Sequence, residues 1–129
     1  MSRALDDLAP VFRLPVFEFL ARTVEGGIPL LIVGTGRTQA EQDAAVLRGV
    51  SWVAHSKHQD GLAIDVCPYS VWMATGPDKL NWDVSNPQWL KIGLIAEGLG
   101  LRWGGRWTHH PDLGHFEYVD PAEQPPSRT

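Results

Sequence analysis

The chain has 129 residues, of which 43% are hydrophobic and 20% are charged, and its formal net charge is -4. Such a length and composition are typical of one soluble globular domain with its own hydrophobic core. The net negative charge excludes a general electrostatic attraction to nucleic acid, so we expect no nucleic-acid partner. The single cysteine, Cys67, excludes an intramolecular disulfide.

The first ten residues do not resemble a signal peptide, because they contain Asp6 and Asp7 and lack a basic start followed by an apolar run. No stretch of the chain approaches the roughly 20 apolar residues that a membrane-spanning helix needs. We therefore expect a protein that is made in the cytoplasm without a signal peptide and has no stable association with a membrane.

The first third of the chain predicts a helix followed by a strand. We expect a short helical turn within residues 3–9. A longer helix is predicted over Pro15–Glu25, where Pro15 suits the first turn and apolar residues recur at helical spacing. Gly26 and Gly27 should end this helix. The apolar run Pro29–Val33 then predicts a buried strand.

A second helix is predicted to begin at Thr38 and to end at Gly49, because Glu41 stands three residues after Thr38 in the spacing of a capping box. Residues 50–57 are expected to be irregular. The run Leu62–Val66 is mostly apolar and predicts another strand.

The region Tyr69–Pro87 predicts a loop with one extended piece near Trp82, because it is rich in Trp, Gly, Pro and Asn. A third helix is predicted over Pro87–Gly98, with Ser85 or Asn86 as its cap. Its inward-facing residues should be Trp89, Leu90, Ile92, Ile95 and Ala96.

The last third predicts two short strands that are joined by a turn and a polar loop. The strands are expected at Leu101–Trp103 and His115–Val119, with the turn at Gly104–Gly105. Residues 121–129 are rich in proline and should form a flexible tail. The chain is thus expected to be one domain over residues 1–120.

His58 and Asp65 lie seven residues apart, with Gly61 between them. Imidazole nitrogens and carboxylate oxygens are both good ligands for a borderline ion such as zinc. Gly61 indicates a tight turn or a close backbone approach, and a carboxylate within an apolar strand is costly unless it is paired or bound to a metal. On this spacing alone a metal site and two unrelated residues both remain open.

His115 lies in a partly buried run near the C-terminus, with Asp112 three residues before it and Glu117 two residues after it. A third ligand at His115 would complete a zinc site with a position left for water, although a lone histidine in such a run is more often a core residue. An acid beside that water can take its proton and pass it to a leaving amine. We favour Asp112 for this role, and Glu117 is the alternative.

Arg37 and Ser56 are further candidates for the site. Arg37 lies between the end of a strand and the start of a helix, where a guanidinium can bind a substrate carboxylate or stabilise an oxyanion. Ser56 precedes His58 by two residues and can bond to the substrate or support a ligand. We expect Trp103 and Trp107 to frame the site, and we place three other histidines in polar loops rather than among the ligands: His55, His109 and His110.

The pattern Ser56-x-His58-x-x-Gly61-x-Ala63-x-Asp65, followed by Asp112-x-x-His115, resembles the zinc peptidases of the D-alanyl-D-alanine carboxypeptidase and L-alanyl-D-glutamate endopeptidase group. Phage endolysins belong to that group. The likeness extends to Arg37-Thr38-x-x-Glu41-Gln42 and to Leu101-Arg102-Trp103-Gly104-Gly105-x-Trp107. It implies an α+β domain in which a small antiparallel sheet carries the zinc site and packs against about three helices.

The resemblance also implies roles for single residues. It makes His58, Asp65 and His115 the Zn2+ ligands, and it makes Asp112 the general base and acid in preference to Glu117. Arg37 matches an arginine that polarises the scissile carbonyl, and Ser56 matches a serine that positions the substrate. Aspartate in place of the glutamate that many relatives carry at position 112 is the form of the endopeptidase branch.

The implied function is zinc-dependent hydrolysis of a peptidoglycan stem peptide by a monomer. The bond between L-alanine and D-glutamate is the first choice of cleavage site. One alternative is a D,D-carboxypeptidase or dipeptidase that acts on D-alanyl-D-alanine termini. A second alternative is a non-catalytic zinc-binding module, although the spare carboxylate of Asp112 argues against it. Since the N-terminus lacks a signal peptide, the likeness to phage enzymes implies that a holin releases the protein to the cell wall.

Overall fold

A four-stranded antiparallel sheet forms the centre of the chain, in a computed structural model that describes residues 1–49, 51, 53, 55–69 and 80–122. The order of the strands is β1-β2-β4-β3. Every neighbouring pair is antiparallel. The strands are β1 Leu30–Gly34, β2 Ala63–Pro68, β3 Arg102–Trp103 and β4 His115–Glu117.

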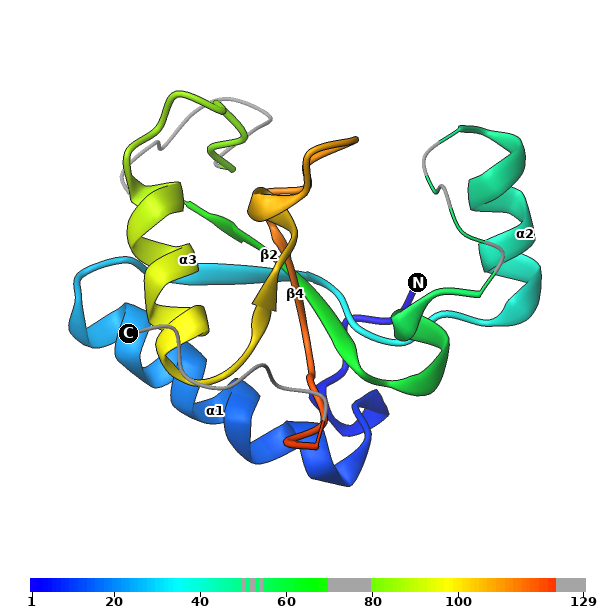
Figure 1. Cartoon of the computed structure of the whole chain (residues 1–129), viewed down its shortest axis with the longest axis horizontal. Helices are drawn as coiled ribbons and strands as arrows, with labels where there is room; N and C mark the ends of the chain where they lie inside the picture. Colours follow the sequence, from blue (N-terminus) through cyan, green and yellow to red (C-terminus); the bar gives the residue numbers. More distant parts are fainter. Residues whose placement is uncertain (50, 52, 54, 70–79, 123–129) are drawn as a thin grey trace.

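Three α-helices accompany the sheet in the described part of the chain: α1 Pro10–Glu25, α2 Gln39–Leu47 and α3 Gln88–Gly98. Figure 1 shows α1 and α3 close together beside the sheet, whereas α2 lies at the opposite end of the view, near the N-terminus. Short 3-10 turns lie at η1 Leu5–Asp7, η2 Lys57–Asp60 and η3 Gly104–Arg106. The α+β class and the number of helices expected from the sequence are confirmed. Among the described residues, no helix is sufficiently long and apolar to cross a bilayer.

The two faces of the sheet have different characters. Ile64 of β2 lies opposite Phe116 of β4, and both are fully buried with the core residues of α1 and α3. The ring of Phe116 lies 4.7 Å from that of Phe19 of α1, between centroids. The next pair along the same strands is Asp65 and His115. Because successive side chains of a strand alternate between faces, this polar pair lies on the face turned away from the helical core.

The helix α1 begins earlier than expected, at Pro10 rather than at Pro15. Pro10 occupies the first turn, where its missing N–H is not needed, so Pro15 lies inside the helix and forfeits one hydrogen bond there. The earlier start buries Phe12 completely in the core. The gain from burying this aromatic side chain offsets the lost hydrogen bond.

Burial also differs from expectation at two elements. The strand β1 was expected to be buried, but it lies at the edge of the sheet and leaves Leu31 41% exposed. In α3, Leu90 was expected to face inward but is 52% exposed, whereas Gly93 is buried. A Cβ at Gly93 would lie 2.3 Å from the Trp103 ring. The face of α3 that packs inward is therefore rotated toward the tryptophan of β3.

Several boundaries shift by a few residues. The strand β2 extends to Pro68, and β4 ends at Glu117 rather than at Val119. The capping box is confirmed, since the Glu41 N–H donates to the Thr38 hydroxyl and the Thr38 N–H donates to the Glu41 carboxylate. Parts of three expected segments lie outside the described residues: the irregular segment at 50, 52 and 54, the loop at 70–79 and the tail at 123–129.

The N-terminal residues pack beside the loops that follow β1 and η2. The Thr35 N–H donates to the carbonyl of Ser2 at 2.7 Å, and the Thr35 hydroxyl donates to the carbonyl of Ala4 at 2.8 Å. Farther along, the Ala9 N–H donates to the carbonyl of Gly61 at 3.0 Å. These bonds connect the first ten residues to the segments on both sides of α2.

The conformation at Gly61 gives a test of this packing. Gly61 ends η2 with φ 70°, and a Cβ there would lie 2.6 Å from the backbone nitrogen of Ala9. We expect Gly61→Ala to lower the free energy of unfolding by about 1–2 kcal/mol for the left-handed conformation, with about 1–3 kcal/mol more for the steric clash. Gly27→Ala is the matched control, since Gly27 has φ 80° and no atom within 4 Å of the added Cβ. If equilibrium urea unfolding shows that both variants lose the same free energy of unfolding, Gly61 makes no tight contact with Ala9.

Candidate metal centre and active site

Three side chains meet on the polar face of the sheet. Asp65 comes from β2, His115 from β4 and His58 from η2, and one ligand atom of each lies within 4.8 Å of the other two. Asp65 and His115 are direct cross-strand partners, so the register of the sheet sets their distance. Both histidines are buried, and Asp65 is partly exposed. The structure thus brings together the three residues that the sequence predicts as metal ligands.

The orientation of His58 is fixed from behind. Its Nδ1 lies 2.7 Å from the carbonyl oxygen of Thr35, and because a carbonyl only accepts, Nδ1 carries the hydrogen in the neutral ring. The other nitrogen, Nε2, then has a lone pair. This buried atom has no hydrogen-bond partner, although an oxygen of Asp65 is 3.1 Å away. A lone pair and a carboxylate at that distance repel each other unless a cation lies between them, so the arrangement fits a metal ion.

The site attracts positive charge even without a metal ion. His115 Nδ1 lies 3.1 Å from Asp65, and His115 Nε2 lies 2.9 Å from Glu117. Burial alone would lower the pKa of His115, but the hydrogen bonds to these two carboxylates raise it to about 9. Burial alone would raise the pKa of Asp65, but the hydrogen bond from His115 and the neighbouring ring of His58 hold it well below its usual range. A protonated His115 therefore supplies part of the charge that a metal ion would bring.

The three candidate metal ligands lie in the wall of a pocket of about 820 Å³, a volume that suits a small molecule or part of a peptide. Arg37, Ser56 and Asp112 line the same pocket, so all six predicted site residues meet there. Three more histidines line it and are not part of the group of candidate metal ligands: His55, His109 and His110. His55 instead pairs with Asp60, at 2.9 Å.

Asp112 belongs to the loop before β4 and lines the same pocket as the candidate ligands. Its backbone N–H donates to the carbonyl of Gly104 at 3.0 Å, and its own carbonyl accepts from the His115 N–H at 3.3 Å. A Cβ at Gly104 would lie 2.5 Å from that carbonyl of Asp112, so the loop needs glycine there. The residue as a whole is exposed, but its carboxyl group is partly desolvated in the pocket. This desolvation, followed by the charge of Asp65, raises the pKa of Asp112 above its ordinary value.

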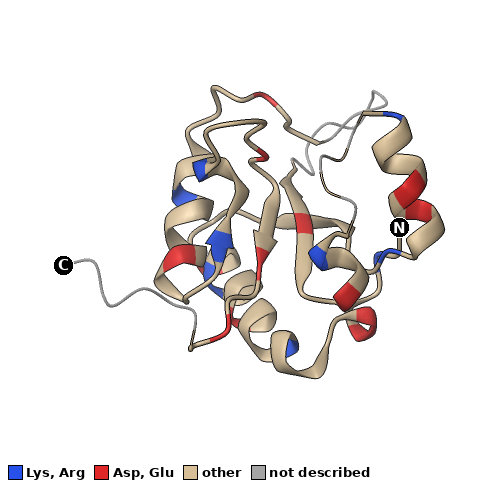
Figure 2. Cartoon of the chain, turned by 45° about the vertical axis from the view of Figure 1, so that its right-hand side comes forward, with Lys and Arg blue, Asp and Glu red and all other residues tan. Residues whose placement is uncertain are grey.

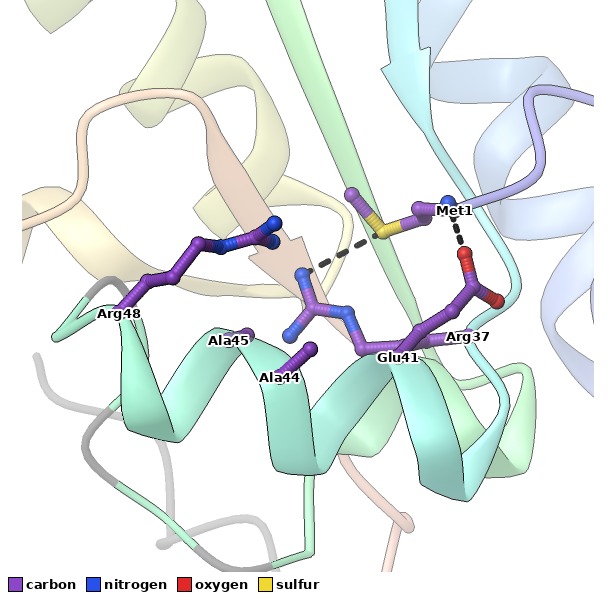
Figure 3. Close-up of a pocket in the computed structure, with 6 residues that line it drawn as sticks. All are labelled: Met1, Arg37, Glu41, Ala44, Ala45 and Arg48. Carbon is purple, nitrogen blue, oxygen red and sulfur yellow. Dashed lines mark hydrogen bonds and ion pairs between the residues drawn. The ribbon is translucent and has the colours of Figure 1, made fainter.

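Arg37 lies at the boundary between this pocket and a smaller hollow of about 390 Å³. Its guanidinium donates to the side-chain oxygen of Gln42 at 2.6 Å and lies 3.5 Å from the sulfur of Met1. Figure 3 shows the Arg37 side chain directed toward Met1, whose amino group pairs with Glu41. The position of Arg37 is compatible with a role at the substrate, and that role stays a prediction.

Ser56 has a clear structural task. Its hydroxyl accepts the His58 N–H at 3.1 Å, and its N–H donates to the side chain of Gln59 at 2.9 Å, which makes a capping box for η2. Ser56 thereby helps to hold the backbone of a predicted ligand. The contact with substrate that the sequence predicts for Ser56 stays a prediction.

The two tryptophans expected to frame the site behave differently. The ring of Trp107 lies 5.0 Å from the ring of His115 and lines the pocket. Trp103 is buried in the core instead, where its indole N–H donates to the carbonyl of Leu113 at 2.8 Å. Its position follows from the alternation of β3, because Trp103 lies opposite Phe116 on the core face.

Sequence reasoning missed the support of both histidines. The Thr35 carbonyl is a backbone atom, and no side-chain pattern identifies it. The sequence indicates Glu117 only as an alternative base, but Glu117 bonds to His115 Nε2 and lies 3.3 Å from Arg102. Its spacing of two residues from His115 on one strand puts the two side chains on the same face, and this spacing is the sequence signal for the contact. Figure 2 shows acidic positions on the central strands as well as on the helices.

Comparisons with known proteins point to one group. A family described as D-alanyl-D-alanine carboxypeptidase matches residues 50–118. The peptidoglycan L-alanyl-D-glutamate endopeptidase CwlK of Bacillus subtilis is 28% identical in an alignment of 129 positions that covers 88% of this chain and 74% of CwlK. An L-alanyl-D-glutamate peptidase of a Listeria phage is 33% identical over 93 residues, which cover 71% of this chain and 31% of the phage protein. The chain thus matches less than a third of the length of that phage relative.

Two solved structures share the fold. The L-Ala D-Glu endopeptidase ChiX of Serratia marcescens superposes with a TM-score of 0.71 at 21% identity, and the match covers 89% of this chain and 83% of ChiX. The vancomycin-resistance D,D-pentapeptidase VanY, solved as a variant in complex with Zn(II), gives a TM-score of 0.60 at 15% identity over 88% of this chain and 73% of VanY. At these identities the likeness shows the architecture alone.

The charge at His115 predicts how the metal-free protein responds to pH. Because the pKa of His115 is raised from 6.5 to about 9 in the folded state, its contribution to stability is fully present below pH 6.5 and is lost as the pH rises through 9. The lowered pKa of Asp65 acts in the opposite direction, so its contribution is lost only in acid. We therefore expect the free energy of unfolding, measured with urea in excess chelator, to fall between pH 6.5 and 9. In the variant His115→Gln the free energy of unfolding should change little with pH over this interval. A fall as steep as that of the wild type would show that His115 is not the group responsible.

Proposed function

The chain belongs to the D-alanyl-D-alanine carboxypeptidase family, and from this premise we propose that it is a zinc-dependent endopeptidase that hydrolyses the L-alanyl-D-glutamate bond of a peptidoglycan stem peptide. One observation carries the proposal: two histidines and an aspartate converge on a pocket that also holds the acid Asp112. Two relatives, CwlK and the Listeria phage protein, are named for this bond, and this supports the choice of substrate.

We assign His58, Asp65 and His115 as the residues that would hold the zinc ion. Two imidazoles and one carboxylate are a donor set that zinc accepts, and three protein ligands are typical of a catalytic rather than a structural site. The orphaned Nε2 of His58 is the observation that fits the ion best. A zinc ion bound there would lower the pKa of a water molecule and polarise a carbonyl oxygen.

Asp112 is the proposed proton carrier. It accepts a proton from the attacking water and then donates a proton to the departing amine. Partial desolvation raises the pKa of its carboxyl group, which suits a residue that must hold a proton for part of the cycle and release it again. A carboxylate that was fully solvated would return the proton less readily.

Cations on the pocket wall suit the proposed substrate. Arg37 is proposed to stabilise the oxyanion that forms from the scissile carbonyl, and Lys57 lines the same pocket. A D-glutamate residue has two carboxyl groups, and the chain of the stem peptide uses one of them. The remaining carboxylate lies near the scissile bond, where a guanidinium or an ammonium group can attract it.

The alternative reaction is cleavage of a D-alanyl-D-alanine terminus, which the description of the family favours. A non-catalytic metal-binding module is a weaker alternative, because it gains nothing from a desolvated acid beside the ligands. We also propose that the protein acts as a monomer at the cell wall after holin-type release, and the phage relative supports this route.

The first test concerns the proton carrier. We expect Asp112→Asn to lower kcat/KM by about 10² to 10⁴, because it removes the general base and acid while leaving the three ligands in place. Purified peptidoglycan would be incubated with the wild type, the metal-stripped wild type and the variant, and the products would be identified by mass spectrometry.

The products separate the three functions. New amino termini at D-glutamate from the wild type alone would support the endopeptidase. Free D-alanine would move the activity to the carboxypeptidase alternative. If the wild type binds zinc and releases neither product, the non-catalytic module becomes the better description.

A second test concerns Arg37. We expect Arg37→Ala to lower kcat by about 10² to 10³, the cost of removing one group that stabilises an oxyanion. The matched control is Arg48→Ala, which removes the same charge from the neighbouring hollow but does not touch the larger pocket. Equal losses of activity in the two variants would show that Arg37 acts only through general charge.

A further inference from the structure

Glu117 occupies a buried position directly behind His115. It lies two residues after His115 on β4, so both side chains are on the same face of the sheet. Its Oε1 is 2.9 Å from His115 Nε2, and its Oε2 is 3.3 Å from a guanidinium nitrogen of Arg102. Arg102 is the cross-strand partner of Glu117 on β3. A carboxylate at neutral pH only accepts, so the hydrogen in the first contact belongs to Nε2 of His115.

This contact decides which nitrogen of His115 faces the ligands. With the hydrogen on Nε2, the lone pair of the neutral ring is on Nδ1. Nδ1 is also the nitrogen that points at Asp65, at 3.1 Å. Glu117 therefore selects both the tautomer and the orientation that present His115 to an ion shared with Asp65.

The two histidines are supported in opposite senses. His58 donates from Nδ1 to the carbonyl of Thr35 and presents Nε2, whereas His115 donates from Nε2 to Glu117 and presents Nδ1. Each ring has an acceptor on its far side, which is the arrangement that fixes metal-bound histidines in proteins. The acceptor behind His115 carries a full negative charge, so it also makes the metal-facing nitrogen of His115 more basic than that of His58.

We propose that Glu117 is a positioning residue that holds His115 as an Nδ1 ligand of the zinc ion, with Arg102 fixing the carboxylate from the next strand. The proposal rests on the proposed function, because it needs the metal at this site. A positioning role also argues against Glu117 as the residue that carries the proton. One of its oxygens bonds to the ligand His115 and the other to Arg102, and a proton placed on either would break a contact that supports the ligand.

The first experiment measures zinc affinity by competition with a chelator in purified protein. We expect Glu117→Ala to weaken the Kd for zinc by about 10- to 100-fold, the usual cost of removing such a support. Glu117→Gln keeps an acceptor oxygen without the charge and should lie between Glu117→Ala and the wild type. A loss of less than tenfold for Glu117→Ala would overturn the proposal. If the wild type itself binds no zinc, the proposed function fails instead.

A control separates support of the ligand from a general loss of stability. Gly27→Ala is strained by the left-handed conformation but does not line the pocket, so it should lower the unfolding midpoint and leave the Kd for zinc unchanged. If Gly27→Ala weakens zinc binding as strongly as Glu117→Ala does, Glu117 acts only through the fold and the proposal is wrong.

A second measurement needs no variant. Long-range proton–nitrogen NMR spectra of the zinc-loaded wild type distinguish the two ring nitrogens of each histidine. We expect the hydrogen on Nε2 in His115 and on Nδ1 in His58. A hydrogen on Nδ1 of His115 would place the metal on the other nitrogen and overturn the proposal, even if every variant at position 117 failed to fold.

Discussion

The hydrogen bond from His58 Nδ1 to the carbonyl of Thr35 is the contact on which the site depends. It turns the lone pair of Nε2 toward Asp65 and leaves that buried atom without a hydrogen-bond partner of its own. The carbonyl is held in place in turn, because the N–H and the hydroxyl of Thr35 both bond to N-terminal residues. The N-terminal segment contributes none of the candidate ligands, but through Thr35 it sets the orientation of His58. The first residues of the chain belong to the functional architecture as much as the sheet does.

The second constraint is the register of β2 against β4. A slip of one residue would move Asp65 and His115 to opposite faces of the sheet. What prevents the slip is the neighbouring pair Ile64 and Phe116, which is fully buried against the helices. Packing in the apolar core thus fixes the relative position of Asp65 and His115 on the polar face. The proposed metal site therefore needs few contacts of its own, because packing on the other face already fixes two of its three candidate ligands.

The fold class and the meeting of the three candidate ligands could be predicted from the sequence because both have local signatures. His58, Gly61 and Asp65 lie within eight residues, and the capping box at Thr38 is a pattern of four. The errors fall where the outcome depends on distant partners. Proline suits the first turn of a helix at Pro10 as well as at Pro15, and only the burial of Phe12 decides between them. The position of Trp103 beside Gly104 and Gly105 predicts a place at the site, but pairing with β4 turns it into the core. Backbone acceptors such as that of Thr35 leave no trace in the sequence at all.

Three carboxylates lie within this one pocket, and their partners explain why they do not do the same chemistry. Asp65 faces both histidines, so its negative charge is favoured and its pKa is held low. Glu117 bonds to His115 and Arg102, and its pKa is also lowered against the effect of burial, by His115 first. Asp112 bonds to the backbone of its own loop, and desolvation raises its pKa. Asp65 and Glu117 are therefore kept ionised by their positively charged partners, whereas the environment of Asp112 favours the gain and loss of a proton. The difference among three similar side chains follows from what each one touches, and it favours the loop before β4 rather than the sheet for the proposed proton-transfer step.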